Sequence, residues 1–150
     1  MIEKALQKFR SFPGCITFPP AAAADIQKVN YTMRKLGFCE IPPEYRLFLG
    51  TTDGLSYNGI EFFGTRSHYR EKKAYTFPDL AASTKHYQEY LFFKNKIVIG
   101  RVSESLIFYD GVNALYAVAD RLTLRSRREC TSFDELLGIF IEICDSEQSI

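Results

Sequence analysis

"IPPEYRLFLGTTDGLSYNGIEFFG", residues 41–64, decides the fold, because it holds the signals for a helix, a reversal and a hairpin in direct succession. Two prolines open it, and proline suits the first turn of a helix, where backbone N–H groups lack intrahelical partners. One apolar helix face follows, formed by Tyr45, Phe48 and Leu49. Gly50 disfavours a longer helix, so we expect the helix to stop there or the backbone to approach a neighbour closely.

The second half of this stretch predicts a β-hairpin. Asn58-Gly59 favours a two-residue turn, because both central residues of such a turn need positive φ. Around this turn, the spacing of the apolar side chains changes from the 3.6-residue period of a helix to the two-residue period of a strand. Apolar residues therefore alternate with other residues. The apolar set is Leu55, Tyr57, Ile60 and Phe62, and the alternate set is Ser56, Glu61 and Phe63.

Two helices are expected before this stretch. Apolar residues recur at helical spacing from Ile2 to Phe9, and Pro13-Gly14 ends that pattern. A second helix is predicted to begin at Pro20 and to end at Gly37, with its apolar stripe formed by Ile26, Val29, Met33 and Leu36. With Gly37 in a left-handed conformation, Phe38 is expected to pack back on Met33.

Strands dominate the second half of the chain. Residues 65–73 are polar and basic and predict an exposed loop, and a helix is expected after Pro78 with a face formed by Leu80, Thr84, Tyr87 and Leu91. Three strands are predicted next, at Lys96–Val102, Ser105–Asp110 and Ala114–Ala119. The stretch "RLTLRSRRE" is expected to continue this meander, with Leu122 and Leu124 opposite the cations.

A last helix closes the chain, with capping-box spacing at Ser132 and Glu135. Its large apolar side chains recur at helical spacing, and Cys144 follows them on the same face, as a buried filler. Helices first, a mostly antiparallel β-sheet and a closing C-terminal helix predict an α+β fold, and a chain of 150 residues predicts one domain, 1–150.

Composition limits the classes of function. The net charge of +1 gives no uniform field that would favour nucleic acid or a membrane surface, although Arg66, Arg70, Lys72 and Lys73 alternate with tyrosines. Nucleic-acid binding is therefore disfavoured. The longest apolar run, "LLGIFI", is too short to span a bilayer, and the start lacks a secretion signal, so a cytoplasmic location is expected.

Metal and redox sites are not favoured by the cysteines and histidines. Four widely separated cysteines form no C-x-x-C pair, and neither histidine completes a zinc site. Structural thiols are expected, with a disulfide framework as the alternative in an oxidising compartment. No metal and no cofactor is expected.

Candidate catalytic groups are few. His68 and His86 lack a carboxylate at ligand spacing, so a surface or partner-binding role is favoured for both. Asp53 and Asp110 each precede a glycine, which tight turns explain more simply than catalysis. Glu61 is harder to assign, because it lies on the alternate face of its strand and therefore faces either solvent or a cleft.

With these parts in place, the chain resembles the SUKH superfamily, which includes yeast cell-wall (glucan) synthesis regulators and many bacterial toxin-immunity proteins. The resemblance runs nearly the full length. "IPPEYRLFL" and "TTDGLSYNGIEFFG" are similar to its short helix and its Asn-Gly turn with the following strand, the latter especially in its YrhA-like branch. "IVIGRVSESLIFYD", "LYAVADR" and "TSFDELL" resemble its later strands and closing helix, in the same order. Asp53 stands where the family more often has asparagine, and "RVSES" lacks the family's glycine-rich acidic turn.

This resemblance implies a non-enzymatic protein-binding domain without a cofactor. The leading hypothesis is a bacterial immunity protein that neutralises a cognate toxin by direct binding. We expect the segment to hold Asp53, Tyr57, Asn58 and Glu61 at the edge of a rigid surface. The expected partner-binding residues are the anchors Tyr57, Tyr69 and Tyr109 and the charged rim residues Glu61 and Asp110.

The structural alternative for each of these residues is that tyrosines pack and carboxylates complete turns. Two other functions stay open. One is a regulatory scaffold, as the yeast relatives suggest, and the other is a small hydrolase that uses His68, His86 or Glu61. The partner's identity and the oligomeric state are not encoded in any of these patterns.

Overall fold

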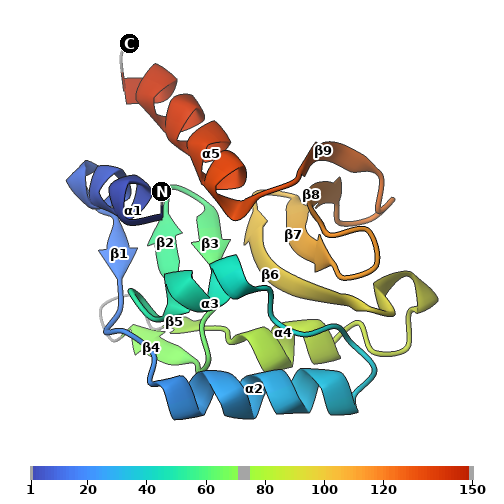
Figure 1. The fold of residues 1–150 in the computed structure, drawn as a ribbon. Helices are drawn as coiled ribbons and strands as arrows, with labels where there is room; N and C mark the ends of the chain where they lie inside the picture. The colour runs from blue at the N-terminus through green and yellow to red at the C-terminus, as the bar shows by residue number, and fades with distance from the viewer. Residues whose placement is uncertain (1, 71–74, 149–150) are drawn as a thin grey trace.

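A seven-stranded antiparallel sheet forms the centre of the computed structural model, which describes residues 2–70 and 75–148. The strand order is β1-β2-β3-β6-β7-β8-β9, and every neighbouring pair is antiparallel (Figure 1). The strands are β1 (Ile16–Thr17), β2 (Leu55–Tyr57), β3 (Ile60–Phe62), β6 (Lys96–Val102), β7 (Ser105–Asp110), β8 (Leu115–Asp120) and β9 (Ser126–Cys130). The expected α+β class and antiparallel sheet are confirmed.

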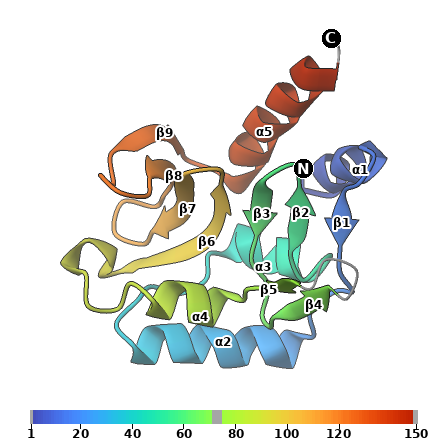
Figure 2. The same ribbon diagram turned by 180° about the vertical axis from the view of Figure 1, so that it is seen from behind.

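The helices lie on two sides of this sheet. α1 (Ile2–Ser11), α3 (Pro43–Leu49) and α5 (Phe133–Gln148) are on one side, in front of the strands in Figure 1 and behind them in Figure 2. α4 (Leu80–Lys85) lies along β6, and α2 (Ala23–Lys35) lies beside α4 in both views. A small second sheet pairs β4 (His68–Arg70) with β5 (Tyr75–Phe77), and a 3-10 turn, η2 (Leu91–Phe93), precedes β6.

The segment 41–64 folds as its residues predict. α3 begins at Pro43 and buries Tyr45, Phe48 and Leu49, and Gly50 is its C-cap. β2 and β3 pair around Asn58 and Gly59, whose φ angles are 48° and 84°. Helix, reversal and hairpin are thus fixed by local signals.

The ends of α2 show one confirmed expectation and one error. Gly37 has a φ of 90°, and the N–H of Phe38 donates to the carbonyl of Met33 at 3.0 Å, which is the Schellman arrangement. The predicted start at Pro20 is wrong. α2 begins at Ala23, because Ala22 is extended and the N–H of Ala21 donates to the carbonyl of Leu49 at 2.9 Å, which ties this segment to α3 instead.

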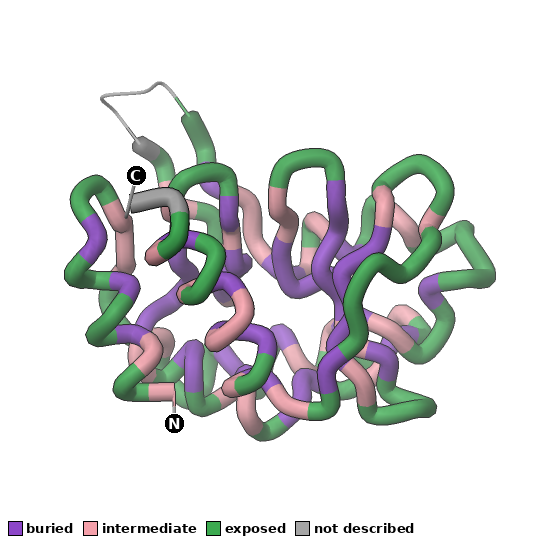
Figure 3. The backbone as a smooth tube through the Cα atoms, turned by 90° about the horizontal axis from the view of Figure 1, so that it is seen from above, coloured by how far each residue is buried: buried purple, intermediate pink, exposed green. Residues whose placement is uncertain are grey.

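An aromatic cluster joins α3, α5 and the sheet. The ring centroid of Phe133 lies 5.2 Å from that of Phe48 and 5.4 Å from that of Phe62, and Phe140 lies 6.0 Å from Phe62. Ser132 caps α5 by accepting a hydrogen bond from the N–H of Glu135 at 3.1 Å, as the capping-box spacing predicts. Figure 3 shows the buried backbone concentrated in the interior and the exposed backbone in the outer turns.

Three local expectations in the second half are wrong. The expected loop at 65–73 contains strand β4, and its residues 71–73 lie outside the described part of the chain. The helix after Pro78 ends at Lys85, so Leu91 does not share its face and is 88% exposed in η2. In the stretch "RLTLRSRRE" only the first part is wrong: residues 121–125 form a turn, in which Leu122 is 84% exposed and Leu124 has a φ of 60°, whereas β9 continues the meander by pairing with β8 as expected.

Candidate functional site

Asp53 lies inside the protein and not at a surface edge, so the expectation that it contacts a partner directly is corrected. Its side chain is 1% exposed. Asp53 Oδ1 accepts hydrogen bonds from the N–H of Thr65 at 2.6 Å and from the Thr65 hydroxyl at 2.9 Å, and Oδ2 lies 2.9 Å from Nε2 of His68. The carboxylate therefore fixes the segment that leads into β4.

His68 is mostly enclosed, which differs from the expected surface role. Its ring stacks on Phe18 with centroids 4.0 Å apart and planes 11° apart, and its side chain is 15% exposed. In a catalytic triad, the nucleophilic hydroxyl is hydrogen-bonded to the imidazole, and the imidazole to the carboxylate. Here the Thr65 hydroxyl bonds to Asp53 instead, which favours a structural role for the cluster.

The other expected partner-binding residues lie on different parts of the molecule. Tyr57 faces the α1 side, where its ring stacks on Phe12 at 5.1 Å, and Asn58 is exposed at the hairpin turn. Tyr109 is half-buried with its ring 4.9 Å from that of Tyr116, and Tyr69 is exposed on β4. They do not form one continuous edge with Glu61, because Glu61 alternates with Ile60 and points to the opposite face from Tyr57.

Asp110 completes a turn, which is the structural alternative. Its carboxylate accepts hydrogen bonds from the N–H of Val112 at 2.9 Å, the N–H of Asn113 at 3.2 Å and the side-chain amide of Asn113 at 2.9 Å. Burial alone raises the pKa of Asp110, but these hydrogen bonds and nearby Lys96 outweigh it and hold the pKa below its ordinary value. The residue is largely buried, so it offers little surface to a partner.

Glu61 belongs to a cluster that joins the main sheet to the small one. It pairs across strands with Arg101, whose Nε donates to Glu61 Oε1 and whose Nη2 donates to the Tyr75 hydroxyl. That hydroxyl also donates to Glu61 Oε2 at 2.8 Å. Burial lowers the pKa of Arg101, but the pairing with Glu61 raises it above its ordinary value, so the guanidinium stays charged.

Arg101 borders an open groove of about 440 Å³ between α4 and the sheet. Residues of α4 and β6 line it, and Figure 2 shows α4 below β6. Its polar lining consists of Ser83, His86, Arg101, Ser103, Ser105 and Arg121. Among the described residues that line it, none carries a carboxylate. This half of the groove presents hydrogen-bond donors and positive charge.

The remaining lining of the groove is apolar. It is formed by Phe63, Pro78, Tyr87, Val98 and Leu106. The guanidinium carbon of Arg101 lies 5.8 Å from the ring centroid of Phe63, so the charged and apolar halves meet at this contact.

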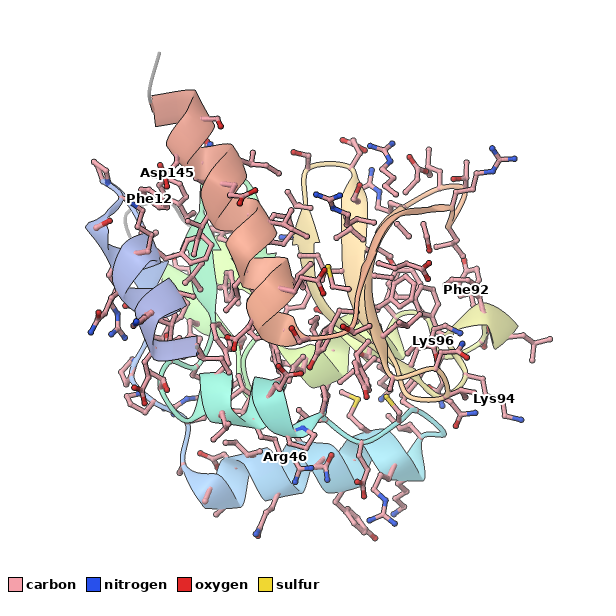
Figure 4. All side chains as sticks on the ribbon, turned by 45° about the horizontal axis from the view of Figure 1, so that its top comes forward. Phe12, Arg46, Phe92, Lys94, Lys96 and Asp145 are labelled. Atoms are coloured by element: carbon pink, nitrogen blue, oxygen red, sulfur yellow. The ribbon has the colours of Figure 1, made fainter. Side chains whose placement is uncertain are left out.

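A second groove lies on the opposite face, between α5 and the ends of the strands. Its volume is about 470 Å³, and Arg128 and Ile143 are among its lining residues. Aromatic residues also gather at the end of the molecule away from α1, where Figure 4 shows Phe92 beside Lys96. The Nζ of Lys96 lies 4.7 Å from the ring centroid of Phe92, which is a cation–π contact.

The cysteines are free thiols. Burial raises the pKa of Cys39 to about 12 and that of Cys15 to about 11, so thiolates, the reactive form, are scarce at neutral pH. Across residues 2–70 and 75–148, no group of three or more His, Cys, Asp or Glu side chains is placed to hold a metal. No helix in the same residues combines the length and apolar character needed to cross a bilayer.

A comparison of the chain with models of known protein families gives no match, and a comparison with curated protein sequences gives none either. The candidate site therefore rests on geometry. Glu61 was found from its position in the sequence, whereas Arg101, Tyr75 and Arg121 were missed. The sequence holds one signal for Arg101. An arginine in the apolar strand "KIVIGRV" is stabilised by an acidic residue on the neighbouring strand, and "GIEFF" contains such a residue.

Proposed function

We propose that this chain is a non-enzymatic protein-binding domain of the SUKH type, acting in the cytoplasm as a bacterial immunity protein that neutralises a cognate toxin by binding it. One observation carries the proposal: Arg101 is held by Glu61 and Tyr75 at the border of an open groove with a charged and an apolar half. Arginine and aromatic side chains held in place before binding are the usual anchors of protein interfaces.

Preorganisation explains why this arrangement suits tight binding. Nanomolar inhibition corresponds to about −12 kcal/mol, which a few well-placed anchors supply more readily than interface area alone. Arg101 loses little side-chain freedom on binding, because it is already held through two of its nitrogens. The order of sequence motifs and the α+β architecture support the same family of functions.

The test first identifies the partner from the neighbouring gene. If that gene encodes a secreted protein with a variable toxic C-terminal domain, this domain is taken as the toxin. Co-expression with that domain should protect growth, and the two proteins should purify together. Arg101→Gln should weaken the complex, whereas Arg128→Gln, in the groove on the opposite face, should leave it intact. Absence of both protection and co-purification would contradict immunity. Pull-down of several housekeeping proteins instead would favour a regulatory scaffold.

A small hydrolase is the second candidate, because Asp53 and His68 form a carboxylate–imidazole pair with 2.9 Å between Oδ2 and Nε2. Its test is turnover of a panel of ester and amide substrates by the full chain. Turnover that is lost in His68→Gln, with folding intact by circular dichroism, would support hydrolysis. No turnover across the panel would count against it.

A further inference from the structure

The groove between α4 and the sheet carries an inference about the chemistry of its ligand, and this inference rests on the proposed function. Two arginines reach it from different elements. Arg101 comes from β6, and Arg121 follows β8. The N–H of Arg121 donates to the carbonyl of Glu104 at 2.9 Å, which fixes its backbone against the β6–β7 turn.

Tyr87 lines the groove together with both arginines. Burial raises the pKa of its phenol, and the positive charges of Arg121 and Arg101 both oppose that rise. Tyr87 itself lines the groove, with its ring edge-to-face to His86 at 4.9 Å. Tyr87, Arg101 and Arg121 therefore line one groove.

The charge of the ligand follows from the partners that the arginines already have. Arg101 is paired with Glu61, and Arg121 Nη2 donates to Glu104 Oε2 at 2.9 Å. Each guanidinium has five N–H donors, so donors remain on both after these pairings. Glu61 and Glu104 lie outside the groove lining and offset only part of the positive charge of the two arginines, so a single negative charge is favoured over the double charge of a phosphate.

The apolar half of the groove indicates which kind of side chain lies beside the carboxylate of the ligand. Pro78 and Tyr87 are partly exposed and offer apolar surface that a bare anion does not use. A volume of about 440 Å³ has room for an acidic side chain together with a neighbouring apolar one. We propose that the groove binds an acidic residue of the partner protein, its carboxylate received by Arg101 and Arg121 and an adjacent apolar side chain packed on Pro78 and Tyr87.

The test is a nuclear magnetic resonance titration of the full ¹⁵N-labelled chain. The probe is the capped peptide acetyl-Leu-Glu-Leu-amide, and its matched control is acetyl-Leu-Gln-Leu-amide. The glutamate peptide should shift the amides of Ser83, His86, Arg101 and Leu106 in a saturable way. The glutamine peptide should bind about tenfold more weakly, since charge-assisted hydrogen bonds are the stronger ones. Inorganic phosphate is the third probe and should bind more weakly than the glutamate peptide.

Variants locate the binding. Arg121→Gln, at an exposed side chain, should fold normally and weaken the glutamate peptide about tenfold, and Arg128→Gln should leave it unchanged. Equal binding of both peptides, tighter binding of phosphate, or an unchanged affinity in Arg121→Gln would each overturn the inference. A toxin complex that is weakened by Arg101→Gln but forms normally with Arg121→Gln would also overturn the inference while leaving the proposed function standing. Peptide binding without any toxin complex would leave the inference standing and remove the proposed function.

Discussion

The hydroxyl of Tyr45 in α3 donates a hydrogen bond to the backbone carbonyl of Phe63, just beyond β3, at 2.6 Å. The carbonyl of Ile99 in β6 lies 3.1 Å from the same hydroxyl. Burial raises the pKa of Tyr45 well above its ordinary value, so the phenol keeps its proton and remains a donor. One side chain thus ties α3 to two neighbouring strands at the point where β3 ends and the groove begins, since Phe63 also lines the groove.

Tyr45→Phe should therefore lower the free energy of unfolding by about 1 to 3 kcal/mol, because it leaves a buried carbonyl without its donor. Urea unfolding followed by circular dichroism measures the change. Tyr31→Phe is the control, because Tyr31 is exposed on α2 and its hydroxyl is available to water. Equal stability of the Tyr45→Phe variant and the natural protein would mean that this hydrogen bond adds nothing to the fold.

Phe140→Ala should cost about 3 to 5 kcal/mol, since it removes a buried ring that packs on Phe62 in the aromatic cluster. Ile143→Ala, one turn further along α5, is the matched control. Ile143 is 48% exposed, so its truncation should cost about 1 kcal/mol. Urea midpoints of the two variants give the comparison, and similar midpoints would show that α5 does not bury the face described above.

The elements that the sequence predicted well are those set by neighbouring residues. Asn58-Gly59 specifies its turn through positive φ angles, and Ser132 specifies the start of α5 through one hydrogen bond. Pro20 was misplaced because its segment is held by a contact with Leu49, which is distant in the sequence. Leu122 followed a strand pattern, yet a positive φ at Leu124 ends that pattern in a turn.

The candidate site was harder to predict, because its parts are brought together only by the fold. Glu61 and Arg101 are 40 residues apart, and Asp53 and His68 are 15 apart. Alternation placed Glu61 on the face opposite Ile60, which is correct, but it cannot give the partner across the sheet. The Asp-Gly pattern predicted a turn at Asp53 and gave no sign that the carboxylate turns inward to Thr65.

Asp110→Asn tests the turn between β7 and β8 through its pH dependence. Because the folded-state pKa of Asp110 lies below its ordinary value, its stabilising contribution is full above the unfolded-state pKa near 3.8 and is lost as the pH falls through the folded-state pKa. The variant should be about 1 to 2 kcal/mol less stable than the natural protein at pH 7. That difference should shrink as the pH is lowered from about 5 to about 2, as measured by urea unfolding at each pH. A difference that stays constant over this range would show that the charge of Asp110 does not stabilise the turn.

Gly64 and Gly138 form a matched pair for the last prediction, because alanine at each adds the same methyl group to different surroundings. At Gly64 the added Cβ would lie 2.2 Å from the backbone oxygen of Asp53 and 2.6 Å from its carboxylate, so Gly64→Ala must displace the segment that Asp53 holds and should cost about 3 kcal/mol or more. At Gly138, inside α5, nothing lies within 4 Å of the added atom, and Gly138→Ala should stabilise the protein by about 0.5 to 1 kcal/mol through helix propensity. The thermal unfolding midpoints of the two variants should therefore shift in opposite directions. A Gly64→Ala variant as stable as the natural protein would rule out the close approach of Asp53 to Gly64, which accompanies the contacts of Asp53 with Thr65 and His68.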